Sequence, residues 1–247
     1  MGRLPTVADF PKKLKLNIVP PPKDAPPTNI LVLLHGLGDN HESFTALGKQ
    51  MNLPETACIS LLGPQNLLDL GGFHWGDDIM FDSTSGGLDP DAGFKQSTEV
   101  LKSLIIQDVL VEKCGYKPRE IMFFGFGQGG MAALDLAVAL HQASPPLELG
   151  GIISIGAPLP SSAPSSLDPP KCKTPILICA GNDDSTVTSS AEEKLKHVFH
   201  YVEVKRYRKS GDSMPNSRDE MLPIMQFFSR RLRSVAGVPE GAVEVGS

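Results

Sequence analysis

Residues 121–131 read Ile-Met-Phe-Phe-Gly-Phe-Gly-Gln-Gly-Gly-Met. The apolar run at the start is typical of a buried strand, and the stretch from residue 131 to 140 has the period of a helix. A glycine-rich turn between strand and helix matches the nucleophile elbow, G-x-S-x-G, which lifts a serine hydroxyl above a sheet to attack an acyl carbon. The serine position holds Gly127. The sequence therefore predicts an elbow that lacks its attacking atom.

Outward from this turn, short apolar runs alternate with stretches of helical period. This alternation is typical of the α/β class, with a mostly parallel central sheet flanked by helices on both faces. We expect strands at 30–35, 58–62, 120–125, 151–155, 176–180 and 202–207. We expect helices at 94–113, 131–142, 189–199 and 218–233.

The chain has 247 residues, 40% of them hydrophobic, which suffices for the core of one domain. Residues 1–29 are expected to form a proline-rich extension or edge strand, because the five prolines within 17–29 exclude a central strand. Residues 30–234 are expected to form the domain, and residues 235–247 a flexible tail. Segments 63–93 and 156–175 are expected to be irregular loops of the kind that form lids or binding sites.

Composition argues against several classes of function. The formal net charge is -5 and the basic residues are mostly scattered, which disfavours nucleic-acid binding. The four cysteines lie far apart without metal-ligand spacing, so we expect reduced core residues and predict neither a metal nor a cofactor. No apolar run is long enough to span a bilayer, and the first 20 residues lack the apolar stretch of a signal peptide, which predicts a cytoplasmic protein.

The first six residues match the short pattern for N-myristoylation at Gly2. An ordinary frayed N-terminus is the simpler interpretation of so short a motif.

Four motifs occur in order along the chain. They are Leu34-His35-Gly36-Leu37-Gly38-Asp39, His74-Trp75-Gly76-Asp77, Gly125-Phe126-Gly127-Gln128-Gly129-Gly130 and Gly181-Asn182-Asp183-Asp184. As an ordered set, covering about residues 30–233, they resemble the acyl-protein thioesterase and carboxylesterase family of α/β-hydrolases. The resemblance implies an α/β-hydrolase fold and serine-dependent cleavage of esters or thioesters, typically of fatty-acylated cysteines, short-chain aryl esters or lysophospholipids.

The resemblance also assigns roles to residues of the site. It assigns the two oxyanion donors to the main-chain N–H groups of Leu37 and Gln128. His35 belongs to the oxyanion motif, although residues 35–38 also read as a plain glycine-rich turn. His74 and Trp75 are expected at the pocket, with a Trp75 packed on the core as the alternative.

The remaining triad positions are only partly filled. Asp184 matches the acid position of the family, and Asp183 is the competing choice. The simpler explanation of Asp184 is a negative charge that stabilises the start of the following helix. The catalytic histidine is missing, since residues 208–217 contain none and none follows His200. Only His41 and His74 could reach the mouth of the pocket as a relocated base.

Without a histidine or serine nearby, Asp184 needs a new partner or water, because an unpaired buried carboxylate is costly. Lys209 or Arg208, in the expected histidine loop, is the predicted partner.

The two losses together favour a degenerate triad, because in a serine protease removing the nucleophile or the histidine alone costs roughly 10⁶ in turnover, about as much as removing the whole triad. We expect a pseudo-hydrolase that binds an acyl-containing small molecule, an acylated protein or another protein partner. The alternatives are a weak or unconventional ester or thioester hydrolase that uses a polarised water, and a structural interaction subunit.

A rival interpretation from another class is dinucleotide binding. Gly125, Gly127 and Gly130 also satisfy the G-x-G-x-x-G fingerprint. That fingerprint needs an acidic residue at the end of the following strand. The nearest candidate, Glu148, precedes the expected strand 151–155, so this interpretation is disfavoured.

Overall fold

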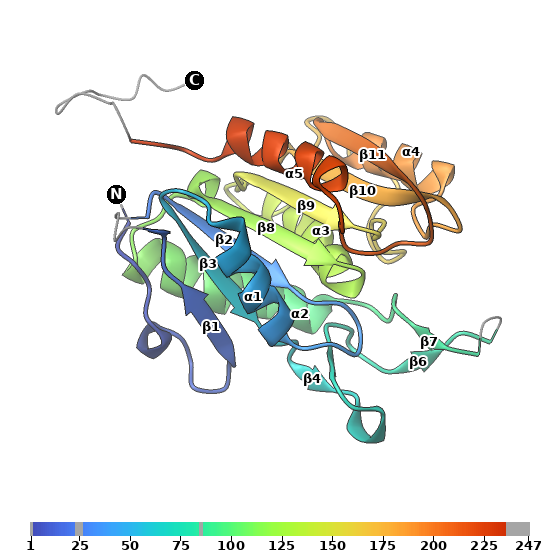
Figure 1. The fold of residues 1–247 in the computed structure, drawn as a ribbon, viewed down its shortest axis with the longest axis horizontal. Coiled ribbons are helices and arrows are strands. Elements are labelled where there is room, and N and C mark those ends of the chain that lie inside the picture. The colour runs from blue at the N-terminus through green and yellow to red at the C-terminus, as the bar shows by residue number, and fades with distance from the viewer. Residues whose placement is uncertain (1, 23–26, 84–85, 236–247) are drawn as a thin grey trace.

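The computed structural model describes residues 2–22, 27–83 and 86–235. Its centre is a seven-stranded sheet in the order β1-β3-β2-β8-β9-β10-β11, with helices on both faces (Figure 1). Strand β1 runs antiparallel to β3, and every other neighbouring pair of this sheet is parallel. The predicted fold class is confirmed.

The strands of the sheet are β1 Leu16–Val19, β2 Asn29–Leu34, β3 Thr56–Leu61, β8 Ile121–Phe126, β9 Gly151–Ile155, β10 Ile176–Asp183 and β11 Val202–Ser210. The helices are α1 His41–Met51, α2 Lys95–Glu99, α3 Gln128–His141, α4 Ser189–Val198 and α5 Arg218–Arg231. Helix α2 continues directly into η4, Val100–Lys113, which has wider π-type turns. All of the expected strands and helices are present, with ends that differ from expectation by at most three residues.

Helix α1 was not expected from the sequence. The side chain of Asn40 accepts a hydrogen bond from the Glu42 N–H at its start, and Asn52 ends it in the left-handed conformation. Asparagine is common at both of these positions, before the first and after the last residue of a helix. The apolar signal in between is weak, with Phe44 the one large side chain that is fully buried.

The segment 63–93 is more regular than expected. It contains two short hairpins and one helical turn: β4 Gln65–Asn66 with β5 Phe73–His74, β6 Met80–Phe81 with β7 Leu88–Asp89, and η3 Leu68–Leu70. Figure 1 shows these hairpins extending away from the central sheet. Strands of two residues are too short to produce a sequence period. Segment 156–175 is irregular, as expected.

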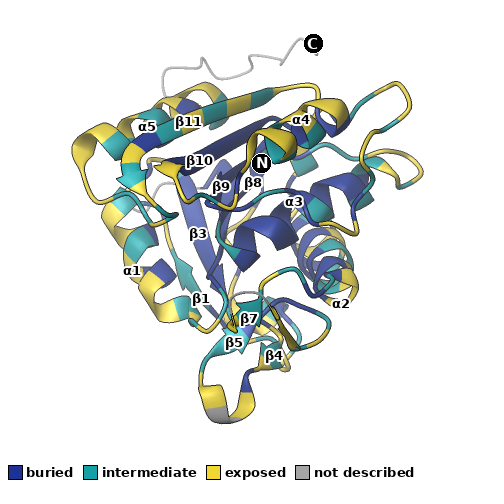
Figure 2. Cartoon of the chain, turned by 90° about the vertical axis from the view of Figure 1, so that its right-hand side faces the viewer, coloured by how far each residue is buried: buried dark blue, intermediate teal, exposed yellow. Residues whose placement is uncertain are grey.

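The core lies on both faces of the sheet (Figure 2). One cluster of buried side chains packs under α3 and η4, and the other under α1 and α5. All four cysteines are buried and free, which confirms that they are core residues. Gly2 is also buried, and a Cβ there would lie 2.6 Å from the ring of Tyr116. Myristoylation of Gly2 stays a prediction. Of the predicted tail, residues 236–247 lie outside the described residues.

Candidate active site at the turn between β8 and α3

Gly127 stands between the end of β8 and the start of α3 with φ 48° and ψ −121°. Its N–H donates to the carbonyl of Ile155, at the end of β9, over 2.9 Å. A Cβ built on Gly127 would meet no atom within 4 Å. The turn therefore has the left-handed φ of a strained elbow, and there is room at its tip for a side chain.

The glycines on either side of Gly127 are required by close approach. A Cβ on Gly125 would lie 2.5 Å from the backbone of Gly129. A Cβ on Gly129 would lie 2.5 Å from the carbonyl oxygens of Leu34 and His35. Helix α3 thus packs directly against the start of the turn 35–38, which brings the two segments that carry the expected oxyanion donors together.

The expected donors lie at the ends of regular elements. Gln128 is the first residue of α3, so its N–H has no acceptor within the helix. Leu37 is half-buried in the turn after β2, and the neighbouring Gly38 N–H donates to Phe73 over 3.0 Å. Their role as oxyanion donors remains a prediction.

The side chain of Gln128 has a structural role that sequence reasoning missed. It is 1% exposed, its Oε1 accepts from the N–H of Trp75 over 2.8 Å, and its Nε2 donates to the carbonyl of Pro90 over 3.0 Å. The elbow is therefore tied to two distant points of segment 63–93. The motif drew attention to the main chain of Gln128, and no local pattern pointed to these partners.

His35 is a fully buried, neutral packing residue. Its Nε2 accepts from the Gly63 N–H over 2.8 Å, so Nδ1 carries the proton and donates to the Gly36 carbonyl over 2.7 Å. Burial lowers the pKa of His35. Both ring nitrogens are used, which leaves neither free for a ligand.

Trp75 is 2% exposed and belongs to the core. Its indole N–H donates to the His35 carbonyl over 2.9 Å, and the Ser97 hydroxyl donates to the carbonyl of Trp75 over 2.5 Å. His74 is also buried, and burial lowers its pKa. The structure thus places His35, His74 and Trp75 together beneath the turns, and contact of any of them with an acyl chain stays a prediction.

Asp184 lies just beyond β10, exposed, with φ 51°. Its Oδ2 accepts a hydrogen bond from the Ser210 hydroxyl over 2.7 Å. The predicted cationic partner is wrong: Lys209 pairs with Glu220 over 3.0 Å, and no ion pair joins Arg208 to Asp184. The physical reason is that the carboxylate is exposed to water, so hydration and one hydroxyl replace a cation.

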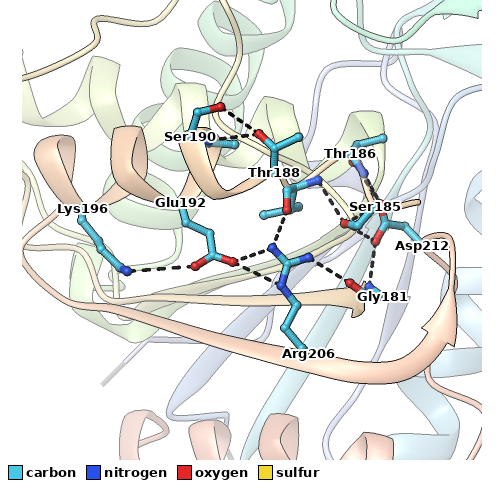
Figure 3. A network of polar contacts seen from close by, with 11 residues as sticks. Gly181, Ser185, Thr186, Thr188, Ser190, Glu192, Lys196, Arg206 and Asp212 are labelled. Atoms are coloured by element: carbon cyan, nitrogen blue, oxygen red, sulfur yellow. Dashed lines mark hydrogen bonds and ion pairs between the residues drawn. The ribbon is translucent and has the colours of Figure 1, made fainter. Parts of the chain in front are cut away.

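Asp212 lies in the loop after β11, where the resemblance predicts the missing histidine. Its Oδ1 accepts from the Gly181 N–H over 3.0 Å and from the Ser185 hydroxyl over 2.9 Å. Its Oδ2 accepts from the N–H and the hydroxyl of Thr186, over 2.8 and 3.0 Å (Figure 3). A Cβ on Gly156 would overlap Asp212. Gly156 directly follows Ile155, whose carbonyl binds Gly127, so Asp212 stands close to the elbow.

Arg206 stabilises the same loop by donating hydrogen bonds, whereas Asp212 accepts them. It donates to the carbonyls of Gly181, over 2.9 Å, and Val187, and it forms an ion pair with Glu192 over 2.5 Å (Figure 3). Asp212 thus collects hydrogen-bond donors from the loop and Arg206 collects acceptors. Together they fix the backbone that precedes and follows Asp184.

Two other expectations can be placed. Glu148, the weak candidate for a dinucleotide site, precedes β9 and pairs with Arg119 over 2.9 Å. His41, the other candidate for a relocated base, begins α1, with its Nε2 3.6 Å from Glu42. In the part of the chain that the structure describes, no helix is both long and apolar enough to cross a bilayer.

A mostly parallel sheet covered on both faces, with a glycine-bounded elbow at the carboxyl end of β8, defines an α/β-hydrolase fold. The chain belongs to the phospholipase/carboxylesterase family, which it matches over residues 16–232. The resemblance found in the motifs is confirmed.

Known relatives agree with this assignment. An uncharacterized hydrolase of Schizosaccharomyces pombe is 33% identical over 210 residues, covering 83% of each chain. Acyl-protein thioesterase 1 of Kluyveromyces lactis is 26% identical over 228 residues, covering 85% of this chain and 95% of the relative. Among solved structures, the esterase PE8 superposes with a TM-score of 0.70 at 24% identity, covering 89% of this chain and 99% of that one. At that identity the superposition shows the fold alone.

Proposed function

We propose that this chain is a catalytically impaired member of its family that binds an acyl group at the elbow without turning it over. The observation that carries the proposal is Gly127, which keeps the elbow's backbone conformation and offers open space where a nucleophile would stand. A glycine has no atom that could form an acyl-enzyme.

The surroundings of the elbow support the same reading. The loop that would supply the base has the carboxylate of Asp212, and its acceptor positions are occupied by Gly181, Ser185 and Thr186. The N–H of Gln128, at the start of α3, is a main-chain donor that needs no side chain. A carbonyl oxygen seated there would accept a hydrogen bond, and its acyl carbon would face an empty position.

The first test is turnover of a short-chain aryl ester by the purified chain. We expect the same rate for the unmodified chain and for Gly127→Ala, which controls for contaminating esterases. A rate clearly above that of the control would favour the weak hydrolase instead, because an oxyanion hole alone leaves some 10³ to 10⁴ of rate advantage over water.

The second test measures binding. Trp75 is the one tryptophan of the chain, and its main-chain N–H donates to the side chain of Gln128, so its fluorescence reports on the elbow. We expect a saturable change on titration with an octanoyl ketone that mimics a thioester. Gly127→Leu should abolish the change by filling the space. Gly115→Leu is the matched control, because Gly115 also has positive φ and open surroundings. Binding that survives in Gly127→Leu would exclude the elbow as the site.

A specific observation favours an acylated protein over a free acyl compound. Segment 63–93, which is tied to the elbow through Gln128, exposes four large apolar side chains: Leu68, Leu70, Met80 and Phe81. Exposed apolar side chains that gather on one segment mark sites of protein contact. We expect the same acyl mimic to bind more tightly on a peptide than on a small thiol. Phe81→Ser should remove that difference while leaving binding of the small mimic unchanged.

A further inference from the structure

A cavity of about 460 Å³ lies at the opposite end of the sheet from the elbow. Its cations come from different elements: Arg119 precedes β8, Lys173 precedes β10, and Arg230 and Arg231 end α5. Tyr201 directly precedes β11, and Glu203 is the second residue of that strand. Because these strands run parallel, this cationic pocket stands at their amino ends, whereas the elbow follows the carboxyl end of β8.

Two of the four cations are balanced by carboxylates. Arg230 contacts both oxygens of Glu203 over 2.8 Å, and Arg119 pairs with Glu148 over 2.9 Å. The Nε of Arg231 donates a hydrogen bond to the carbonyl of Gly150 over 2.9 Å. Within the described residues, neither the Nη groups of Arg231 nor the ammonium of Lys173 has a hydrogen-bond or ion-pair partner. The cationic pocket therefore carries about two uncompensated positive charges.

The crowding of these cations is unfavourable without an anion. Arg231 is only partly exposed, and burial, together with the charges of Arg119 and Arg230, lowers its pKa. The negative end of the α5 dipole accounts for arginines in its last turn. It does not account for Lys173 and Arg119, which reach the same cavity from other parts of the chain.

We infer that the cationic pocket binds a small phosphate monoester, with the phosphate at Arg231 and Lys173 and a flat ring on Tyr201. A phosphate dianion matches two positive charges, and a guanidinium fork suits its oxygens. The ring of Tyr201 contacts that of His200 in a T-shaped pair, with the centroids 4.4 Å apart. The side chain lines the cavity and is still 55% exposed, so part of its ring is available for stacking. The cavity is of the size that holds small molecules.

Calorimetric titration of the full chain with phenyl phosphate at low ionic strength tests the inference. We expect saturable binding, tighter than that of inorganic phosphate, and none with phenol. Lys173→Met and Arg231→Met should each weaken the binding about tenfold, and Tyr201→Ala should remove the advantage of phenyl phosphate over inorganic phosphate. Lys95→Met is the matched control, because Lys95 is exposed on α2 away from the cavity and its loss changes the net charge equally.

Three results would overturn the inference: no saturable binding of phenyl phosphate, unchanged affinity in Lys173→Met, or equal weakening in Lys95→Met. Lys173 is exposed and unbonded, so its variant tests the site even if Arg231→Met fails to fold. Acyl binding at the elbow should not change in either variant, which keeps this test separate from that of the proposed function.

Discussion

Gly127 adopts a conformation that disfavours any residue with a Cβ, although space is available for one. Replacement by serine therefore adds backbone strain without a clash. We expect Gly127→Ser to lower the free energy of unfolding by about 1 kcal/mol, measured by urea denaturation. Gly129→Ala, whose Cβ would press on two carbonyl oxygens, should cost more than about 3 kcal/mol. A serine variant clearly more stable than the parent chain would contradict the strain argument.

Asp135 is a carboxyl group of α3 whose pKa is raised above its ordinary 3.8, mainly by burial, although Thr98 donates to it over 2.6 Å. At a pH well below 3.8 the carboxyl group is protonated in both the folded and the unfolded chain, so it does not change the free energy of unfolding. As the pH rises past 3.8 the unfolded chain ionises first, so the folded state loses relative stability, and the loss is complete above the raised pKa.

Asp135→Asn should therefore raise the thermal midpoint at pH 7 and leave it unchanged near pH 3, as measured by circular dichroism. Asp168→Asn is the control, because Asp168 is exposed. An equal gain at both pH values would point to packing instead of ionisation.

Single residues differ in how far the sequence predicts them. The elbow glycines were predictable because the local motif itself contains them, and the close approach of Gly125 to Gly129 arises within that motif. The approach of Gly129 to the carbonyls of Leu34 and His35 joins distant segments, and no local pattern shows it. The partner of Asp184 was not, because it depends on whether the side chain is exposed, which the order of residues in the loop does not determine. The contacts of Gln128 with Trp75 and Pro90 join positions 53 and 38 residues apart, beyond the reach of a local pattern.

At the scale of elements, the loop between β11 and α5 is fixed by Asp212. Asparagine or histidine at this position would either point an N–H toward the N–H groups of Gly181 and Thr186, which are themselves donors, or leave these donors without an acceptor. We expect Asp212→Asn to lower the free energy of unfolding by about 2 kcal/mol in urea denaturation.

By the same reasoning, the pair Gly127→Ser, Asp212→His should be destabilised and should not gain ester hydrolysis. A pair that hydrolyses an aryl ester well above Gly127→Ser alone would show that the loop can rearrange to present an imidazole.

The regular elements were predicted in proportion to the burial of their side chains. Strands β2, β3, β8 and β9 consist almost entirely of buried residues and stand out as apolar runs. Helix α1 covers one edge of the sheet with few apolar residues, so its signal is weak. The paired strands β4 with β5 and β6 with β7 are two residues long, and tertiary contacts rather than propensity define them.

At the scale of the whole molecule, all four cysteines are enclosed by the core. Burial raises the pKa of Cys58 to about 12 and that of Cys179 to about 11, so little thiolate exists at pH 8. We expect an aromatic disulfide reagent to leave the native thiols unmodified for hours and to titrate all four within minutes in denaturant. Rapid reaction of one thiol in the native protein would reveal a local opening near it.

The last helix is tied back to the first strand of the parallel sheet. The side chain of Asn29, where β2 begins, exchanges two hydrogen bonds with the backbone of Arg233, over 2.8 and 2.9 Å, and Thr28 adds a third. The chain thus leaves the domain at the amino ends of the strands. The last described residues therefore lie on the side of the sheet opposite the elbow. A biosensor that immobilises the protein through this side would leave the elbow, with the acyl binding proposed for it, open to the solution.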